Sequence, residues 1–139
     1  LSKKHIINWF KKKYNSYSFV WDVIFISKRL LNLIYNYDFF STSATEQEKN
    51  IIKFIIYKNF LTLKFKKYFI NKRHEQPIEI SKTVLLLNLI YNLKINNIII
   101  QINEQITHQI NDLGLHKSIN PSIQVEFINE LYEIKNISL

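Results

Sequence analysis

The sequence contains no cysteine and no methionine, and it has one glycine and two prolines. Without cysteine we expect no disulfide framework and no thiolate metal site. A single glycine, Gly114, excludes a glycine-rich phosphate-binding loop. The most apolar stretches, 19–26 and 84–93, are shorter than the roughly 20 residues that cross a bilayer. We therefore expect no membrane span, and the N-terminus lacks the apolar run and cleavage site of a signal peptide.

Catalytic groups are also sparse. The four histidines, at positions 5, 74, 108 and 116, have no metal-ligand spacing with one another or with carboxylates. No combination of serine, histidine and aspartate stands out as a nucleophilic site. We therefore expect a non-enzymatic protein with no metal and no cofactor.

What the chain does have is a hydrophobic and basic composition. It is 47% hydrophobic and 14% aromatic, which is enough to build a core, and its net charge is +8. Such a charge suits a polyanionic partner such as RNA, DNA or an anionic membrane surface. The 25 Ile, 16 Asn and 17 Lys are residues that A- and T-rich codons specify. This bias suggests an AT-rich genome, of which a mitochondrial genome is a common example. Leu1 is compatible with an alternative start codon, with processing and with an incomplete record.

Charge divides the chain in two. Residues 1–82 hold 14 Lys and 2 Arg against 6 acidic residues, a charge of +10, whereas residues 83–139 hold 3 Lys against 5 acidic residues, a charge of −2. Electrostatic attraction to a polyanion therefore belongs to the first part.

We expect residues 1–45 to be a basic, divergent N-terminal extension. Lysines surround Trp9 and Phe10 in residues 1–13, a pattern that fits a basic arm or short helix and equally a solvated, poorly ordered terminus. An apolar stretch from 17 to 40 predicts a helix through Ile34. Residues 41–45 are polar, and one of their hydroxyls is placed to cap the next helix.

Residues 46–80 form the expected helical part. A long amphipathic helix is predicted over 48–73, with its apolar face marked by Ile51, Ile55, Leu61, Phe65 and Phe69 and its lysines elsewhere. Residues 71–80, which include Pro77, are the clearest linker.

Residues 81–139 are expected to form a small module. Ser81 is placed to cap a helix, on which the leucines and isoleucine at 85, 86, 89, 90 and 93 form one face. Residues 96–110 are ambiguous, because their isoleucines favour a strand by propensity and a helix by spacing. Alternation at Ile123, Val125 and Phe127, followed by residues 131–134, predicts a short hairpin.

The second half resembles a known family. The stretch Leu85-Leu86-Leu87-Asn88-Leu89-Ile90-Tyr91-Asn92-Leu93-Lys94-Ile95 is similar to the R-L-D-N-V-V-Y-R-L-G-F signature of the small-subunit ribosomal protein S-four family. In the same register, Gln101 falls on the glutamine of T-R-A-Q-A-R and His108 on the histidine that opens H-G-H-I. Pro121-Ser122 falls on the P-S-Y pair. Upstream, residues 64–69 resemble Q-F-R-N-Y-Y, so the resemblance covers about residues 46–136.

The resemblance implies an α+β fold: a helical N-terminal part followed by a two-helix module with a short hairpin, of the αL type. It implies a structural constituent of the small ribosomal subunit. Together with the bias toward residues of A- and T-rich codons, it leads us to expect an organelle-encoded protein in the mitochondrial matrix. The implied partners are small-subunit rRNA, neighbouring small-subunit proteins and mRNA near its entrance.

Two departures from the family concern charge. Residues 98–104 lack the arginines that the family carries on its second module helix, and the module is net acidic. Phosphate contacts dominate affinity for nucleic acid, so we assign the main RNA contact to residues before position 83. For most of the isoleucines at 98–102 we expect a place in the core rather than against a neighbouring protein.

The predicted RNA contacts are mostly basic residues of the first part. They are Lys11, Lys12, Lys13, Lys28, Arg29, Lys49, Lys53, Lys64, Lys66, Lys67, Lys72, Arg73, Lys82, His108 and Lys117. Trp9, Tyr14 and Tyr68 are candidates to stack on unpaired bases, although buried packing is commoner for aromatic residues. The main alternative is an accessory subunit of a mitochondrial respiratory-chain complex at the membrane, with the same residues facing lipid headgroups or protein neighbours.

Overall fold

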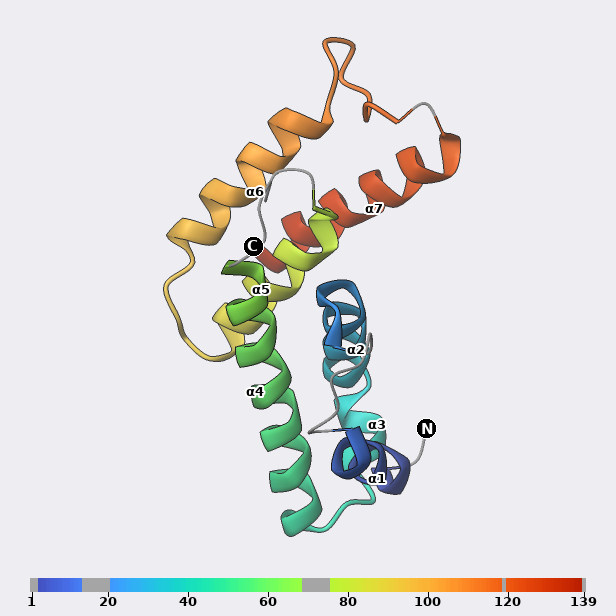
Figure 1. The fold of residues 1–139 in the computed structure, drawn as a ribbon, viewed down its shortest axis with the longest axis vertical. Coiled ribbons are helices and arrows are strands. Elements are labelled where there is room, and N and C mark those ends of the chain that lie inside the picture. The colour runs from blue at the N-terminus through green and yellow to red at the C-terminus, as the bar shows by residue number, and fades with distance from the viewer. Residues whose placement is uncertain (1–2, 14–20, 69–75, 119, 139) are drawn as a thin grey trace. The chain divides into compact units, whose positions relative to one another are not determined.

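The computed structural model describes residues 3–13, 21–68, 76–118 and 120–138. Over these residues the chain forms helices and no strand (Figure 1). The helices are α1 (Lys3–Lys13), α2 (Val23–Tyr35), α3 (Tyr37–Ser41), α4 (Glu46–Tyr68), α5 (Ile78–Ile90), α6 (Asn96–Gln109) and α7 (Pro121–Ser138). They belong to two compact units, residues 1–68 (unit 1) and residues 69–139 (unit 2). This boundary lies inside the segment 46–80 that the sequence suggested as one part.

The predicted α+β fold is wrong, because the expected hairpin is the single helix α7. The side chain of Asn120 accepts a hydrogen bond from the Ser122 N–H at 2.9 Å, and Pro121 occupies the first helical position, where its missing N–H costs nothing. Phe127 and Ile134, seven residues apart, are the buried side chains of this helix. The alternation over residues 123–127, which had predicted a strand, is therefore part of a longer pattern with the helical period.

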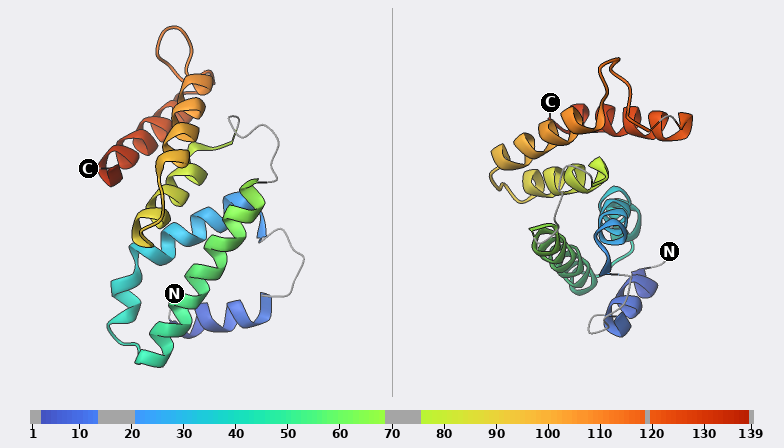
Figure 2. Two further views of the ribbon diagram at one scale, coloured as in Figure 1. Left: turned by 90° about the vertical axis from the view of Figure 1, so that its left-hand side faces the viewer. Right: turned by 45° about the horizontal axis from the view of Figure 1, so that its top comes forward.

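Unit 1 is built on two long helices. In both views of Figure 2, α2 lies along α4, and the two helices are in contact. Their facing residues include Ile26, Leu30, Ile52 and Phe60, all at most 1% exposed. The helix α1 packs on α4, where the Phe10 ring meets the Phe54 ring edge to face at 6.4 Å between centroids.

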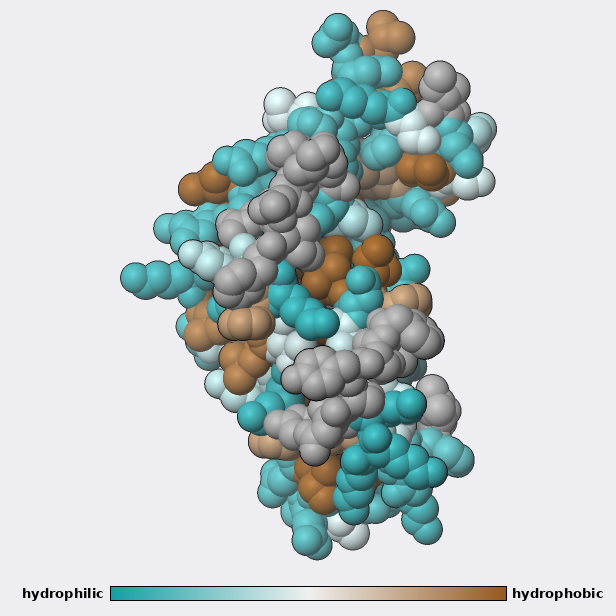
Figure 3. All heavy atoms as spheres, viewed as in Figure 1, coloured by the Kyte–Doolittle hydropathy of each residue, from teal (hydrophilic) through white to brown (hydrophobic). Residues whose placement is uncertain are grey.

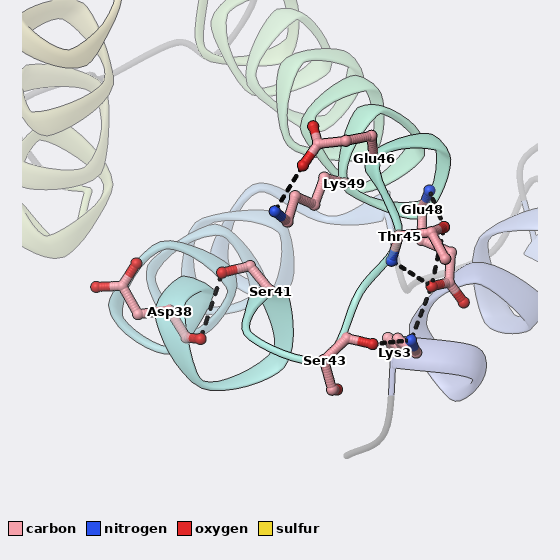
Figure 4. Close-up of polar contacts among 8 residues, drawn as sticks. All are labelled: Lys3, Asp38, Ser41, Ser43, Thr45, Glu46, Glu48 and Lys49. Carbon is pink, nitrogen blue, oxygen red and sulfur yellow. Dashed lines mark hydrogen bonds and ion pairs between the residues drawn. The ribbon is translucent and has the colours of Figure 1, made fainter.

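A capping box begins α4 (Figure 4). Thr45 Oγ1 accepts a hydrogen bond from the Glu48 N–H at 3.2 Å, and Glu48 Oε2 accepts one from the Thr45 N–H at 2.9 Å. The expectation that a hydroxyl in 41–45 caps this helix is confirmed. Lys3 of α1 forms an ion pair with Glu48 at 2.7 Å and donates to the Ser43 carbonyl, so the same carboxylate also joins α1 to the cap.

The predicted apolar face of α4 is only partly right. Ile55 is buried, but Leu61 is 42% exposed and Phe65 is 66% exposed. The buried face instead includes Ile52 and Leu63, on the opposite side of the helix. Four-residue spacing between 61 and 65 was the wrong guide, since the α-helix turns 100° per residue and a strict four-residue repeat drifts around it. Residues 69–73 of the predicted helix lie outside the described residues.

Unit 2 is built around α5, which packs against both α6 and α7. The helix begins at Ile78, directly after Pro77, and not at the predicted Ser81, which is fully buried inside it. Residues 78–80 thus belong to the helix and not to a linker. Leu85 is buried as predicted, whereas Leu89 and Ile90, at the end of the helix, are exposed.

Residues 96–109 form a helix, which resolves the ambiguity between strand and helix. Ile98, Ile102 and Gln105 of α6 are buried at helical spacing. After α6 the chain turns through Gly114, whose φ of +77° lies in the left-handed region that glycine favours, and an isolated bridge joins Ile110 to His116.

Candidate nucleic-acid interface

Positive charge is concentrated in unit 1. Residues 1–68 hold 12 Lys and 1 Arg against 4 acidic residues, a formal charge of +9, whereas residues 69–139 hold 5 Lys and 1 Arg against 7 acidic residues, −1. Figure 3 shows hydrophilic and apolar side chains side by side on the surface that this unit forms. A polyanion would therefore be attracted to unit 1.

Several predicted contacts have exposed side chains in unit 1. They are Lys11, Lys12, Lys13, Lys28, Lys53 and Lys64. The first three occupy the last turn of α1, where a positive charge also interacts favourably with the helix dipole. These six lysines are accessible to phosphates.

Arg29 has a different environment from the one its sequence position suggested. Its Nε and Nη2 both donate to Oδ1 of Asn59, at 3.0 and 2.9 Å. The guanidinium carbon also lies 4.4 Å from the ring centroid of Trp9 and 5.1 Å from that of Trp21. Burial lowers the pKa of the Arg29 guanidinium to about 10, so the group remains charged at neutral pH. Arg29 of α2 therefore links α4, through Asn59, with α1, through the Trp9 ring that stacks on its guanidinium.

Three further lysines predicted to bind RNA make contacts within the unit. Lys66 donates to the Trp21 carbonyl at 2.5 Å, and Lys49 forms an ion pair with Glu46 at 2.7 Å. Lys67 is 6% exposed. Their charges contribute to the field of the unit, but their ammonium groups are less accessible than those on α1. Lys72, Arg73 and Tyr14 lie outside the described residues.

Lys82 of unit 2 is buried in an ion-pair cluster. Its Nζ lies 2.8 Å from Glu130 Oε2 and 2.6 Å from Glu133 Oε2, and its side chain is 3% exposed. Burial alone would lower the pKa of the Lys82 ammonium, but the two carboxylates outweigh it and the pKa is raised. The lysine thus joins α5 to α7 and is withdrawn from any phosphate. His108 and Lys117, the other predicted contacts in this unit, are exposed.

The exposed side of α4 combines aromatic rings with lysines. Its exposed large apolar side chains are Phe54, Tyr57, Leu61, Phe65 and Tyr68. We call these five residues the α4 stripe; at 100° per residue they span about 80° of the helix circumference, opposite the buried face.

Lysines flank the α4 stripe on both sides. Lys53 and Lys64 lie along one edge and Lys58 along the other, as the same 100° rotation places them. The Lys58 ammonium lies 5.5 Å from the ring centroid of Phe54. Lys58 was not among the predicted RNA contacts, although it belongs to the same helix as Lys53 and Lys64. Proteins that bind single-stranded nucleic acid combine aromatic rings, which stack on bases, with nearby cations, which neutralise phosphates.

A pocket lies among α1, α2, α3 and α4 of unit 1. Its volume is about 820 Å³. Trp9, Phe25 and Phe39 supply aromatic walls, and Arg29 and Asn32 supply polar groups. Sequence reasoning gave no sign of it, because its lining residues come from several helices whose packing the sequence does not state.

Two other kinds of site were sought among the described residues. Histidine, aspartate and glutamate side chains in this part of the chain form no group of three that suits a metal ion. Among the described helices, none has the length and apolar character needed to cross a membrane.

Comparison with known proteins adds no relative. The chain matches no protein-family model, no curated protein and no solved structure.

Proposed function

We propose that this protein is an RNA-binding structural constituent of the small subunit of a mitochondrial ribosome. The observation that carries the RNA-binding part is the α4 stripe with Lys53, Lys58 and Lys64 along its edges, in a unit of formal charge +9. Each lysine that neutralises a phosphate releases a condensed counterion, which favours binding at low salt. The stripe supplies ring faces for bases that are not paired.

The assignment to the small ribosomal subunit has a separate support. It comes from the sequence register of Asn88, Tyr91, His108 and Pro121-Ser122, which resembles that of the S-four family. The helix α7 replaces the hairpin of that family, and Lys82 is held by Glu130 and Glu133. The RNA contact is therefore assigned to unit 1, and unit 2 is assigned contacts with neighbouring proteins of the subunit.

Unit 2 has a surface that suits such neighbours. Val125, Ile128 and Tyr132 of α7 are between 58% and 65% exposed, and at 100° per residue they lie on one side of the helix, within about 60° of its circumference. Large apolar groups exposed close together often mark an interaction site. Under the same proposal, the protein is located in the mitochondrial matrix, and mRNA near its entrance to the small subunit is a further partner.

The proposal is tested by incorporation into the ribosome. The triple variant Lys53→Glu, Lys58→Glu, Lys64→Glu should be lost from the small-subunit fraction on sedimentation. The matched control is Lys94→Glu, Lys117→Glu, Lys135→Glu, three exposed lysines of unit 2 whose reversal changes the net charge equally. Equal incorporation of both variants, or equal loss, would overturn the assignment of the RNA contact to α4.

The exposed apolar residues of α7 also favour the alternative, an accessory subunit of a respiratory-chain complex at the mitochondrial membrane. Alkaline carbonate extraction and sedimentation separate the two functions. Cofractionation with small-subunit rRNA that ribonuclease or high salt abolishes supports the ribosome. Cofractionation with a respiratory complex that ribonuclease leaves intact supports the alternative.

A further inference from the structure

We infer that the pocket of unit 1 captures an unpaired nucleobase of the bound RNA. The inference rests on the proposed RNA-binding function and names a second contact within it, apart from the α4 stripe. The observations that support it are the volume of the pocket, the aromatic groups at its walls, and the polar groups that stand beside them.

Size is the first of these observations. A volume of about 820 Å³ falls within the roughly 300–1,000 Å³ typical of sites for small organic groups. A single base with its sugar occupies less than this. The pocket therefore admits a base from an RNA whose backbone stays outside.

Aromatic faces are the second. Phe25 and Phe39 line the pocket, and they are 49% and 79% exposed, so part of each ring is accessible from solvent. Trp9 contributes a third ring, already held in place by Arg29. Bases stack on such rings irrespective of sequence, because every base has a flat π face.

Polar groups at the walls are the third. Asn32 and Asn36 lie one turn apart at the end of α2 and both line the pocket. The Asn36 Nδ2 donates to the Asn32 carbonyl at 2.9 Å, which fixes the amide in place. An asparagine amide both donates and accepts, and it matches the donor and acceptor on one edge of adenine.

The charge at the pocket favours RNA over a purely apolar occupant. Arg29 lines the wall with its guanidinium fixed by two hydrogen bonds to Asn59. The guanidinium is engaged by Asn59 and the tryptophan rings, so it contributes a fixed positive charge that attracts the phosphate of the nucleotide whose base enters the pocket, without a direct contact. An acyl chain or an apolar peptide offers no hydrogen-bonding group to the Asn32 and Asn36 side chains at the wall.

The test compares RNA with and without bases. The probes are a single-stranded adenylate 12-mer and an abasic 12-mer of equal charge, each titrated onto the full chain. The wild-type protein should bind the adenylate 12-mer more tightly. Phe39→Ala should weaken that binding by about 5- to 150-fold, the range that loss of one stacked base produces, and leave abasic binding unchanged. Because Phe39 is 79% exposed, the substitution leaves the core intact, and circular dichroism checks this.

A matched control and a direct readout complete the experiment. Tyr132→Ala removes an aromatic ring of 65% exposure from unit 2 and should change neither affinity. Photo-cross-linking with a 4-thiouridine oligonucleotide should label peptides of α2 and α3. Equal binding of both 12-mers, no effect of Phe39→Ala, or cross-links confined to other helices would each overturn the pocket inference. If the wild-type chain binds neither 12-mer and no rRNA, the proposed function itself fails.

Discussion

Arg29 and Asn59 are joined by two hydrogen bonds, of 3.0 and 2.9 Å, to a single amide oxygen. The pair links α2 to α4 across 30 residues of chain, and the Asn59 Nδ2 donates in turn to the Ile55 carbonyl at 2.7 Å. The Asn59 side chain is fully buried. Its Nδ2 is held by a carbonyl of its own helix, and its Oδ1 accepts hydrogen bonds from the Arg29 guanidinium of α2. This contact connects the packing of unit 1 with the wall of its pocket.

The first prediction concerns this pair. Asn59→Ala removes the acceptor of a charged donor, which typically costs about 2 to 3 kcal/mol. Urea unfolding followed by tryptophan fluorescence measures it, since Trp9 and Trp21, the only two tryptophans, both belong to unit 1. Asn50→Ala, at an exposed position of the same helix, should change the free energy of unfolding by less than about 0.5 kcal/mol. A similar loss in both variants would contradict the role of the pair.

The second prediction concerns the start of α4. Thr45→Ala removes the side-chain oxygen that accepts from the Glu48 N–H, and loss of such a cap costs about 1 kcal/mol. Gln47→Ala, an exposed residue in the same first turn, is the control. The same fluorescence-detected unfolding distinguishes them. An unchanged urea midpoint for Thr45→Ala would show that the capping box does not stabilise the unit.

The third prediction concerns the buried ammonium of Lys82. Removing both carboxylates, with Glu130→Gln and Glu133→Gln, leaves a nearly fully buried charge without compensation, whereas Lys82→Met leaves Glu133 45% exposed and Glu130 23% exposed, with only the Glu130 Oε2 atom buried. The double glutamine variant should therefore lose more helical stability than Lys82→Met, as measured by circular dichroism in urea. The opposite order would mean that the ammonium is solvated and the ion pairs contribute little.

Lys82 also predicts a pH dependence. Its pKa is raised in the folded chain, because the two carboxylates outweigh the effect of burial. A raised pKa means that the ammonium stabilises the fold fully below the unfolded lysine pKa, about 10.4, and that this contribution is lost as pH rises through the folded value. The stability advantage of the wild type over Lys82→Met should thus shrink as the pH rises above about 10. A difference that stays constant across this range would contradict the coupling.

The sequence predicted some of these features for sound physical reasons. Residues 46–68 have no glycine or proline and a strong helical period, so the existence of α4 was clear, and the threonine that caps it lies in the polar break before it. The pattern of residues 96–110 left strand and helix both open, because isoleucine propensity and helical spacing pointed different ways, and the structure forms α6 there with Ile98, Ile102 and Gln105 buried.

Other features were missed, the first because a local helix-start signal was overlooked and the others because they depend on tertiary context. Alternation at residues 123, 125 and 127 predicted a strand, while the signal that decided the outcome was Asn120 as a cap and Pro121 at the first helical position. The side of α4 that faces the core depends on where α2 lies, which the sequence does not state. Charge alone suggested phosphate contacts for Arg29 and Lys82, but each has partners from another helix, Asn59 for the first and Glu133 for the second.

The most direct test of the central claim is the salt dependence of binding to a mitochondrial small-subunit rRNA. With Lys53→Gln, Lys58→Gln and Lys64→Gln, the slope of log K against log salt should become shallower by roughly 2 to 3, because three phosphate contacts are lost. With Lys94→Gln, Lys117→Gln and Lys135→Gln the slope should stay at the wild-type value. An unchanged slope in the α4 variant, or an equal change in both, would contradict the account that unit 1 binds RNA through α4.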